Sequence, residues 1–192
     1  MKLTIIFDNS SDAGYKSGWG FSCLIEAEKT ILFDTGCDGE SLLFNLKKSG
    51  YDTDNIDMIV LSHDHEDHTG GLSRFLKENN DVDVYVLKTF SEKIKQEIKD
   101  KARLVIIEDF TKICDNVFTT GILKGKIEEQ SLLIKRGDKV KIIVGCSHPG
   151  VDNIIRFASK LGEVDAIFWG FHGFDKLDVL KGIKSIGACH CT

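Results

Sequence analysis

Three histidines and three acidic residues lie within six consecutive positions of the chain, from His63 to His68. They follow the short apolar run at residues 57–61, which predicts a buried strand. Imidazole nitrogens and carboxylate oxygens are ligands for zinc, iron and manganese. On an extended segment His63 and His65 would point both rings to one side, and Asp67 and His68 could serve a second ion. Because half of the chain's six histidines fall here, the segment predicts a metal centre rather than a solvated acidic loop.

A second motif accompanies the histidines. Residues 32–36 read Leu-Phe-Asp-Thr-Gly, and residues 69–71, directly after the histidines, read Thr-Gly-Gly. With the pattern His-x-His-x-Asp-His, this pairing resembles the metallo-β-lactamase superfamily. Other segments resemble one branch of that superfamily, which includes archaeal dihydropterin ribofuranosylaminobenzene-phosphate synthase. These segments begin at Phe7, Gly20, Glu129, Gly145, Gly170 and His190.

The resemblance implies an α/β fold of the αββα type, a four-layer sandwich. Two mixed β-sheets would pack face to face with helices on the outer faces, and metals would bind at one sheet edge. At 192 residues and 42% hydrophobic composition, the chain is long enough for one well-buried domain and short for two. We therefore expect residues 1–192 to form a single domain.

The resemblance also assigns ligands for two divalent metal ions. One ion would be held by His63, His65 and His148, and the other by Asp67, His68 and His190. All six histidines follow apolar, strand-like segments directly or within a few residues, so stacked strands would gather them at one edge. Each set offers three protein ligands and leaves a position for water. Zinc is the expected metal, with manganese and iron as alternatives.

Three further residues receive expected roles. Asp34 matches a family aspartate that orients the histidine loop, with a plain turn aspartate as the alternative. Asp67 is expected to bind the second metal and also to position or deprotonate the nucleophilic water. His172, in the segment Gly-Phe-His-Gly, is expected to contact substrate or act as a general acid, with a core histidine as the alternative.

The cysteines mark a departure from the commonest superfamily pattern. Gly145-Cys146 stands where a strand-end Gly-Asp would supply a carboxylate that bridges both metals. Cys146 could replace that carboxylate as a thiolate or could be a small buried hydrophobe. Cys189 and Cys191 flank His190, but Cys-x-Cys lacks the ligand spacing usual for zinc, so we leave both out of the metal set. The six cysteines are expected to be thiols.

These residues predict an enzyme. We expect a metal-dependent hydrolase in which a metal-bound hydroxide attacks a small ester, lactone or phosphoester. The alternative is a transferase like the branch's synthase, in which a pterin diphosphate is displaced; pterin stacking would use aromatics such as Trp19, Phe21 and Phe171. A third reading is an iron-binding redox protein, because nitrogen and oxygen ligands also accept iron.

Composition limits the partners. The formal net charge of -5 and the pI near 5.7 argue against an electrostatic nucleic-acid binder. No window approaches eighteen apolar residues and no secretory signal opens the chain, which indicates a cytoplasmic protein with no membrane partner. The expected partner is a small-molecule substrate, and the sequence leaves the oligomeric state open.

The elements that must position these residues follow from periodicity and turn signals. Strands are expected at residues 2–7, 19–26, 30–33, 57–61, 83–87, 103–108, 117–118, 131–134, 139–144, 164–169 and 185–188. Helices are expected at residues 41–48, 71–77, 91–101, 151–161 and 175–184.

Overall fold

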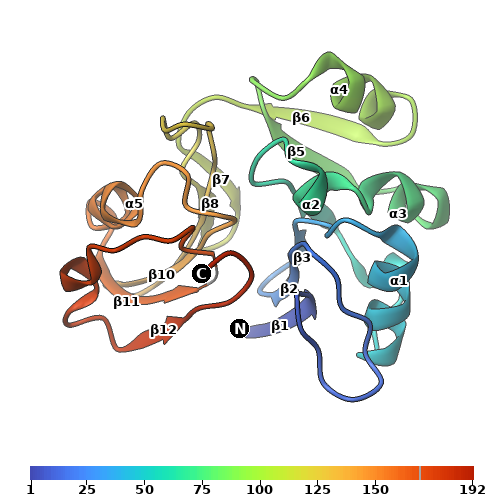
Figure 1. Ribbon diagram of the computed structural model, residues 1–192. Coiled ribbons are helices and arrows are strands. Elements are labelled where there is room, and N and C mark those ends of the chain that lie inside the picture. Colours follow the sequence, from blue (N-terminus) through green and yellow to red (C-terminus); the bar gives the residue numbers. More distant parts are fainter. Residues whose placement is uncertain (169) are drawn as a thin grey trace. The chain divides into compact units, whose positions relative to one another are not determined.

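The computed structural model describes residues 1–168 and 170–192 (Figure 1). The chain divides into two compact units, Met1–Ile107 and Glu108–Thr192. Each unit is built around one six-stranded sheet. The expectation that residues 1–192 form a single domain stays a prediction.

The sheet of the first unit is mixed and follows the order of the chain from β1 to β6. β1, β2 and β3 pair antiparallel, whereas β3, β4, β5 and β6 run parallel. The bounds are β1 Lys2–Phe7, β2 Ser22–Glu26, β3 Thr30–Phe33, β4 Met58–Val60, β5 Asp83–Leu87 and β6 Arg103–Ile107. The central strands are nearly continuous apolar runs, as is typical of parallel strands.

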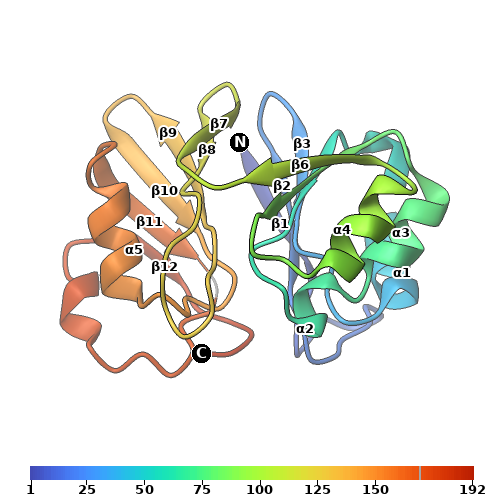
Figure 2. The same cartoon turned by 90° about the horizontal axis from the view of Figure 1, so that it is seen from above.

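Helices connect the parallel strands of the first unit. They are α1 Gly39–Lys48 between β3 and β4, α2 Glu66–Thr69 and α3 Leu72–Glu78 between β4 and β5, and α4 Glu92–Lys99 between β5 and β6. Such crossovers are right-handed, and successive strands step in one direction across this sheet, so the connections fall on the same face. Figure 2 shows α1, α3 and α4 on one face of their sheet.

Local chemistry explains where α1 begins. The Asp38 side chain accepts hydrogen bonds from the backbone N–H groups of Glu40 and Ser41, which satisfies donors that the first turn leaves open. Glu40 lies in the first turn, and Lys47 and Lys48 lie in the last, which complements the helix dipole. This helix carries the chain from the loop after β3 back to the start of β4.

The sheet of the second unit is also mixed, in the order β12-β11-β10-β9-β8-β7. β7 to β10 pair antiparallel, and β10, β11 and β12 run parallel. The bounds are β7 Thr111–Cys114, β8 Val117–Thr119, β9 Leu132–Arg136, β10 Lys139–Ile143, β11 Glu163–Phe168 and β12 Ser185–Gly187. Helix α5, Val151–Ala158, connects β10 to β11 and packs on both strands.

The structure corrects two sequence-based expectations. The helix expected at residues 175–184 is wrong, because only a short 3₁₀ turn forms at Leu177–Leu180. Leu177 is 59% exposed and Gly182 has a positive φ of 89°, so this segment lacks a continuous apolar face. β7 was not expected; Thr111 and Ile113 are β-branched and favour a strand, but the run is only four residues long. The strand expected at residues 164–169 is β11, and Trp169 lies outside the described residues.

Two composition-based expectations can be compared with the structure. Across residues 1–168 and 170–192, the six cysteines remain thiols and no pair forms a disulfide, as predicted. In the same part of the chain, every helix is too short or too polar to cross a bilayer.

Candidate metal centre

The histidine loop, residues 62–69, begins where β4 ends. β3 and β4 are parallel neighbours, so their carboxyl ends lie at the same edge of the sheet. Asp34 follows β3 directly, and Leu61 extends β4 by donating its N–H to the Tyr85 carbonyl at 3.0 Å. The sequence places a carboxylate at one strand end and the histidines at the next, and parallel pairing brings them together.

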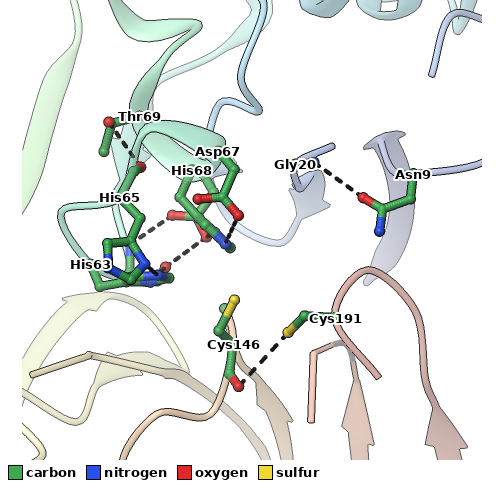
Figure 3. A network of polar contacts seen from close by, with 12 residues as sticks. Asn9, Gly20, His63, His65, Asp67, His68, Thr69, Cys146 and Cys191 are labelled. Carbon is green, nitrogen blue, oxygen red and sulfur yellow. Dashed lines mark hydrogen bonds and ion pairs between the residues drawn. The ribbon is translucent and has the colours of Figure 1, made fainter. Parts of the chain in front are cut away.

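The rings of the histidine loop are close to one another (Figure 3). The ring centroids of His63 and His65 are 4.7 Å apart, and those of His63 and His68 are 4.2 Å apart. His63 Nε2 lies 3.1 Å from His65 Nδ1, and His68 Nε2 lies 3.6 Å from Asp67 Oδ2. The loop therefore presents two pairs of atoms that can bind metal.

Asp34 holds this loop in place. Its carboxylate accepts hydrogen bonds from the backbone N–H and the hydroxyl of Ser62, both at 2.7 Å. His68 Nδ1 lies 2.7 Å from the same carboxylate. Asp34, Ser62 and His68 are all fully buried, and the φ of Asp34 is 58°. Asp34 thus contacts the histidine loop as the sequence led us to expect, and the part played by Ser62 is new.

These contacts determine which ring nitrogens can bind a metal. Asp34 accepts from His68, so Nδ1 carries the proton and Nε2 keeps its lone pair. Ser62 donates its one hydroxyl proton to Asp34, so its oxygen accepts from His63 Nδ1 at 2.8 Å. His63 Nε2 then also keeps its lone pair. The hydrogen bonds to Asp34 and Ser62 thus fix the tautomers of these rings, as the partners of metal-binding histidines commonly do.

The spacing of the donor atoms fits a divalent ion. Two nitrogens bound to zinc at about 2.0–2.1 Å in a tetrahedral arrangement lie about 3.3 Å apart. The separation of 3.1 Å between the His63 and His65 nitrogens is close to this value. The separation of 3.6 Å between the Asp67 oxygen and the His68 nitrogen is also close. The residues of the first unit therefore fit the metal that the motif predicts.

The two flanking glycine motifs pack against each other. Thr35 donates its N–H to the His68 carbonyl at 2.7 Å, and Gly71 donates to the Gly36 carbonyl at 3.1 Å. A Cβ on Gly71 would lie 2.2 Å from the Thr35 carbonyl oxygen, and one on Gly70 would lie 2.5 Å from the Cys37 carbonyl oxygen. Only glycine permits this approach, which explains why the two motifs occur together.

Asp67 is anchored through its backbone. Its carbonyl accepts the N–H of Phe21 at 3.0 Å, and a Cβ on Gly20 would lie 2.6 Å from that carbonyl oxygen. The Gly20 N–H in turn donates to the Asn9 side chain at 3.1 Å (Figure 3). The segments at Phe7 and Gly20 that the sequence singled out therefore support the position of Asp67.

In the second unit, histidines follow three adjacent parallel strands. His148, His172 and His190 lie in the loops after β10, β11 and β12, and the rings of His148 and His172 are 4.5 Å apart. The expectation that strand ends gather histidines holds within this unit. His190 and His172 have positive φ angles of 53° and 46°.

Glu129 is a buried carboxylate that organises the loop carrying His148. One oxygen accepts the backbone N–H groups of Gly145, Cys146 and Ser147, each at 3.0 Å. The other accepts the N–H of His148 at 2.9 Å. In the sequence, Glu129 stands out only through the resemblance, because these contacts span 16 to 19 residues.

Cys146 and Cys191 lie close together in the same unit. Cys191 Sγ is 4.0 Å from the Cys146 carbonyl oxygen (Figure 3). Hydrogen bonding to the Cys146 side chain, opposed by burial and assisted by His172 and by the charge of His190, lowers the pKa of the Cys191 thiol to about 5. Cys146 itself is buried.

The six predicted metal ligands divide between the units. The first unit supplies His63, His65, Asp67 and His68, and the second supplies His148 and His190. The pairing of His148 with the first donor set, and of His190 with the other, stays a prediction. So do the catalytic roles of Asp67 and His172.

Comparison with known proteins now identifies the family. The family model described as the metallo-beta-lactamase superfamily matches residues 20–155, well over half of the chain. The chain belongs to the metallo-beta-lactamase superfamily. The resemblance read from the histidine and glycine motifs is thereby confirmed.

Two curated relatives of this superfamily member come from Methanocaldococcus jannaschii. One is 7,8-dihydropterin-6-methyl-4-(beta-D-ribofuranosyl)-aminobenzene-5'-phosphate synthase, 30% identical over 247 aligned residues, which cover 94% of this chain and 84% of the relative. The other is an uncharacterized protein, 32% identical over 203 residues, which cover 88% of this chain and 78% of the relative. The branch expected from the sequence is the one these comparisons find.

Solved structures confirm the fold class. Tm1679, described as a metal-dependent hydrolase of the beta-lactamase superfamily, aligns with a TM-score of 0.70 at 23% identity, covering 98% of this chain and 96% of that one. The two mixed sheets with their helices are those of the α/β sandwich that metallo-beta-lactamases share.

Proposed function

We propose that this superfamily member is a metal-dependent hydrolase of small esters, lactones or phosphoesters. The observation that supports it best is the paired donor set of the histidine loop. His63 Nε2 and His65 Nδ1 lie 3.1 Å apart, and Asp67 Oδ2 and His68 Nε2 lie 3.6 Å apart. The family pattern adds His148 to the first pair and His190 to the second.

The chain's own residues would perform the following tasks. A divalent ion held by these ligands would supply a Lewis acid and would lower the pKa of a water molecule to about 7. Asp67 retains 20% exposure of its side chain, so its carboxylate can accept a proton from water. Asp34 and Ser62 keep the histidine lone pairs in position. His172 is one candidate for protonating the leaving group.

Zinc is the proposed metal, and two ions are proposed for each chain. Nitrogen and oxygen ligands also bind manganese and iron, so the identity of the bound metal must be measured. Metal analysis of protein purified without added metal, together with an optical spectrum, would decide between them. Dominant zinc without visible absorption would count against the iron-binding redox reading.

The activity test uses generic substrates of each class. Metal-loaded protein is assayed with bis(p-nitrophenyl) phosphate, p-nitrophenyl acetate and an acyl homoserine lactone, before and after chelation. We expect turnover of at least one substrate that chelation abolishes and added metal restores. Turnover of none by fully metallated protein would contradict a general small-ester hydrolase.

A second candidate function is favoured by one comparison. The synthase from M. jannaschii matches 94% of this chain, which supports a transferase acting on a pterin diphosphate. However, the alignment of 247 residues is longer than the 192-residue chain, so the relative carries segments that this chain lacks. Of the aromatics considered for pterin stacking, Trp19 is 62% exposed, whereas Phe21 and Phe171 are buried.

An assay can separate the two functions. The protein is incubated with a dihydropterin diphosphate and a ribofuranosylaminobenzene phosphate, and diphosphate release is followed. Release that requires the second substrate would support the transferase, whereas release with the pterin diphosphate alone would support the hydrolase. A Trp19→Ala variant should raise KM for the pterin only in the transferase case.

A further inference from the structure

Three loops of the second unit bring two thiols and one imidazole together. Cys146 follows β10, His172 follows β11 and Cys191 follows β12. These strands are parallel neighbours (Figure 1). Because each residue follows the carboxyl end of its strand, all three come from the same edge of one sheet. One ligand atom of each, two sulfurs and a ring nitrogen, lies within 4.8 Å of the other two.

Backbone contacts fix the loops against one another. Gly170 donates its N–H to the Gly145 carbonyl at 3.1 Å, and the Ser147 hydroxyl donates to the Gly170 carbonyl at 2.6 Å. The Phe171 N–H donates to the Thr192 hydroxyl oxygen at 3.0 Å. Each bond joins residues beside one cluster member to residues beside another, so the cluster is held from all three loops.

Gly170 makes the close approach possible. A Cβ at this position would lie 2.5 Å from the Gly145 carbonyl oxygen and 2.7 Å from Cys191 Sγ. Contacts this short are not tolerated by real side chains, so glycine lets the Cys191 sulfur lie against the backbone next to Cys146. The glycine therefore contributes directly to the position of a donor atom.

The chemistry of the cluster differs from that of the histidine loop. Sulfur ligands favour softer ions, and a set of two thiolates and one imidazole suits zinc or cadmium. In tetrahedral zinc, bonds of about 2.3 Å to sulfur and about 2.0–2.1 Å to nitrogen place the sulfur and nitrogen about 3.6 Å apart and the two sulfurs about 3.8 Å apart. The limit of 4.8 Å leaves about 1 Å to close, and His172 is exposed, so its ring can adjust.

We propose that Cys146, His172 and Cys191 form a further binding site for a soft divalent metal ion such as Zn²⁺. The site lies wholly within the second unit and uses none of the six ligands assigned to the histidine-loop metals, but it adjoins two of them, because the Cys146 sulfur also lies within 4.8 Å of a ligand atom of His148 and of His190. It gives His172 a ligand role instead of a general-acid role. A fourth coordination position remains for water or an exogenous ligand.

Cobalt provides the test, because thiolate ligands give Co²⁺ a near-ultraviolet charge-transfer absorption that nitrogen and oxygen ligands do not. Protein kept reduced with a phosphine is titrated with Co²⁺ alone. We expect the thiolate absorption to appear, and to be lost in Cys191→Ser and in Cys146→Ser. His172→Ala should weaken Co²⁺ binding at this site by tenfold or more.

The matched control is Cys189→Ser, which changes a cysteine two positions from Cys191. It should keep the thiolate absorption, with circular dichroism used to confirm that every variant is folded. Absorption that survives in Cys191→Ser but disappears in Cys146→Ser would place the thiolate elsewhere and overturn the proposal. No thiolate absorption in the unmodified protein would overturn it as well.

A second test uses only the unmodified protein, so its result does not depend on whether a variant folds. Reduced protein is alkylated with iodoacetamide with and without Cd²⁺, and each cysteine is quantified by mass spectrometry. Cd²⁺ should protect Cys191, while Cys189 continues to react; Cys146 is buried and serves as an internal reference. Equal protection of Cys189 and Cys191, or protection of neither, would contradict the site. The readout does not depend on enzymatic activity, so it is independent of the proposed hydrolase function.

Discussion

A single buried carboxylate connects the residues of the histidine loop. Asp34 accepts two hydrogen bonds from Ser62 and contacts His68 Nδ1 at 2.7 Å. The proton positions of Ser62 and His68 are therefore fixed, and the Nε2 atoms of His63 and His68 keep their lone pairs. Replacing this carboxylate should weaken metal binding without changing any ligand.

Asp34→Asn tests that conclusion. Asparagine tolerates the left-handed backbone found at Asp34 (φ 58°), but its amide replaces one acceptor oxygen with a donor. We expect metal affinity to fall about 10–100-fold, measured by competition with a chromophoric chelator. Asp38→Asn is the control, because asparagine caps α1 as well as aspartate does. Equal affinities in both variants would argue against an orienting role.

Asp67→Asn tests the proposed proton acceptor. Asparagine can still coordinate through its oxygen but cannot accept a proton, so activity should fall about a hundredfold or more. The first metal should remain, as checked by metal analysis on the same sample. Near-normal turnover would restrict the mechanism to a single metal held by His63, His65 and His148.

Asp64→Asn is the matched control for Asp67→Asn. Asp64 belongs to the same loop, yet its side chain accepts the N–H of Ser91 at 2.7 Å and is not among the assigned ligands. Asparagine preserves that acceptor. Activity and metal content in Asp64→Asn should therefore equal those of the unmodified protein.

The shape of the loop after β10 depends on the carboxylate of Glu129, a residue that precedes β9 in the chain. Glu129 is fully buried, and its two oxygens accept four consecutive backbone N–H groups, Gly145 to His148. Because the loop carries both Cys146 and His148, its shape depends on Glu129.

Glu129→Gln should destabilise the protein. The amide keeps one acceptor but turns an NH₂ group toward backbone donors, leaving buried N–H groups unsatisfied. The expected loss is about 1–3 kcal/mol in the free energy of unfolding, measured by urea denaturation. Glu128→Gln, one residue earlier and only partly buried, should change stability by less than about 0.5 kcal/mol. Equal stability of the two variants would contradict the inferred role of Glu129.

Sequence predicted the elements better than it predicted the contacts between them. Apolar runs that end in histidine were found because strand periodicity and ligand chemistry are both local signals. Glu129 and Ser62 were missed as positioning residues, since their importance comes from partners that only the fold brings near. Cys191 was left out of the predicted metal ligands because of the Cys-x-Cys spacing. Its neighbours in the cluster follow other strands, so spacing along the chain does not reveal the group.

Bound metal should raise the free energy of unfolding of the protein. An ion that binds only the folded chain contributes about 2.7 kcal/mol when its concentration is 100 times Kd. For a chain of this length, each kcal/mol shifts Tm by about 2–4 °C. We therefore expect chelation to lower Tm by about 5–11 °C for each ion that it removes, and added zinc to restore it. An unchanged Tm in calorimetry would mean that the ions bind weakly or not at all.

Among the residues that the structure describes, five other than glycine have left-handed backbone angles. One is Asn116, in the turn between β7 and β8, and the other four lie in the loops that carry the candidate site residues: Asp34, Ser147, His172 and His190. Each conformation is unfavourable by about 1–3 kcal/mol. At Asp34 and Ser147 the buried hydrogen bonds with Ser62, His68 and Gly170 offset that cost. Selection for heat resistance alone should therefore favour glycine only at His172 and His190, where each gain would remove an imidazole. Heat resistance and chemistry would compete directly at these two positions, so a thermostabilised variant should be designed with both held constant.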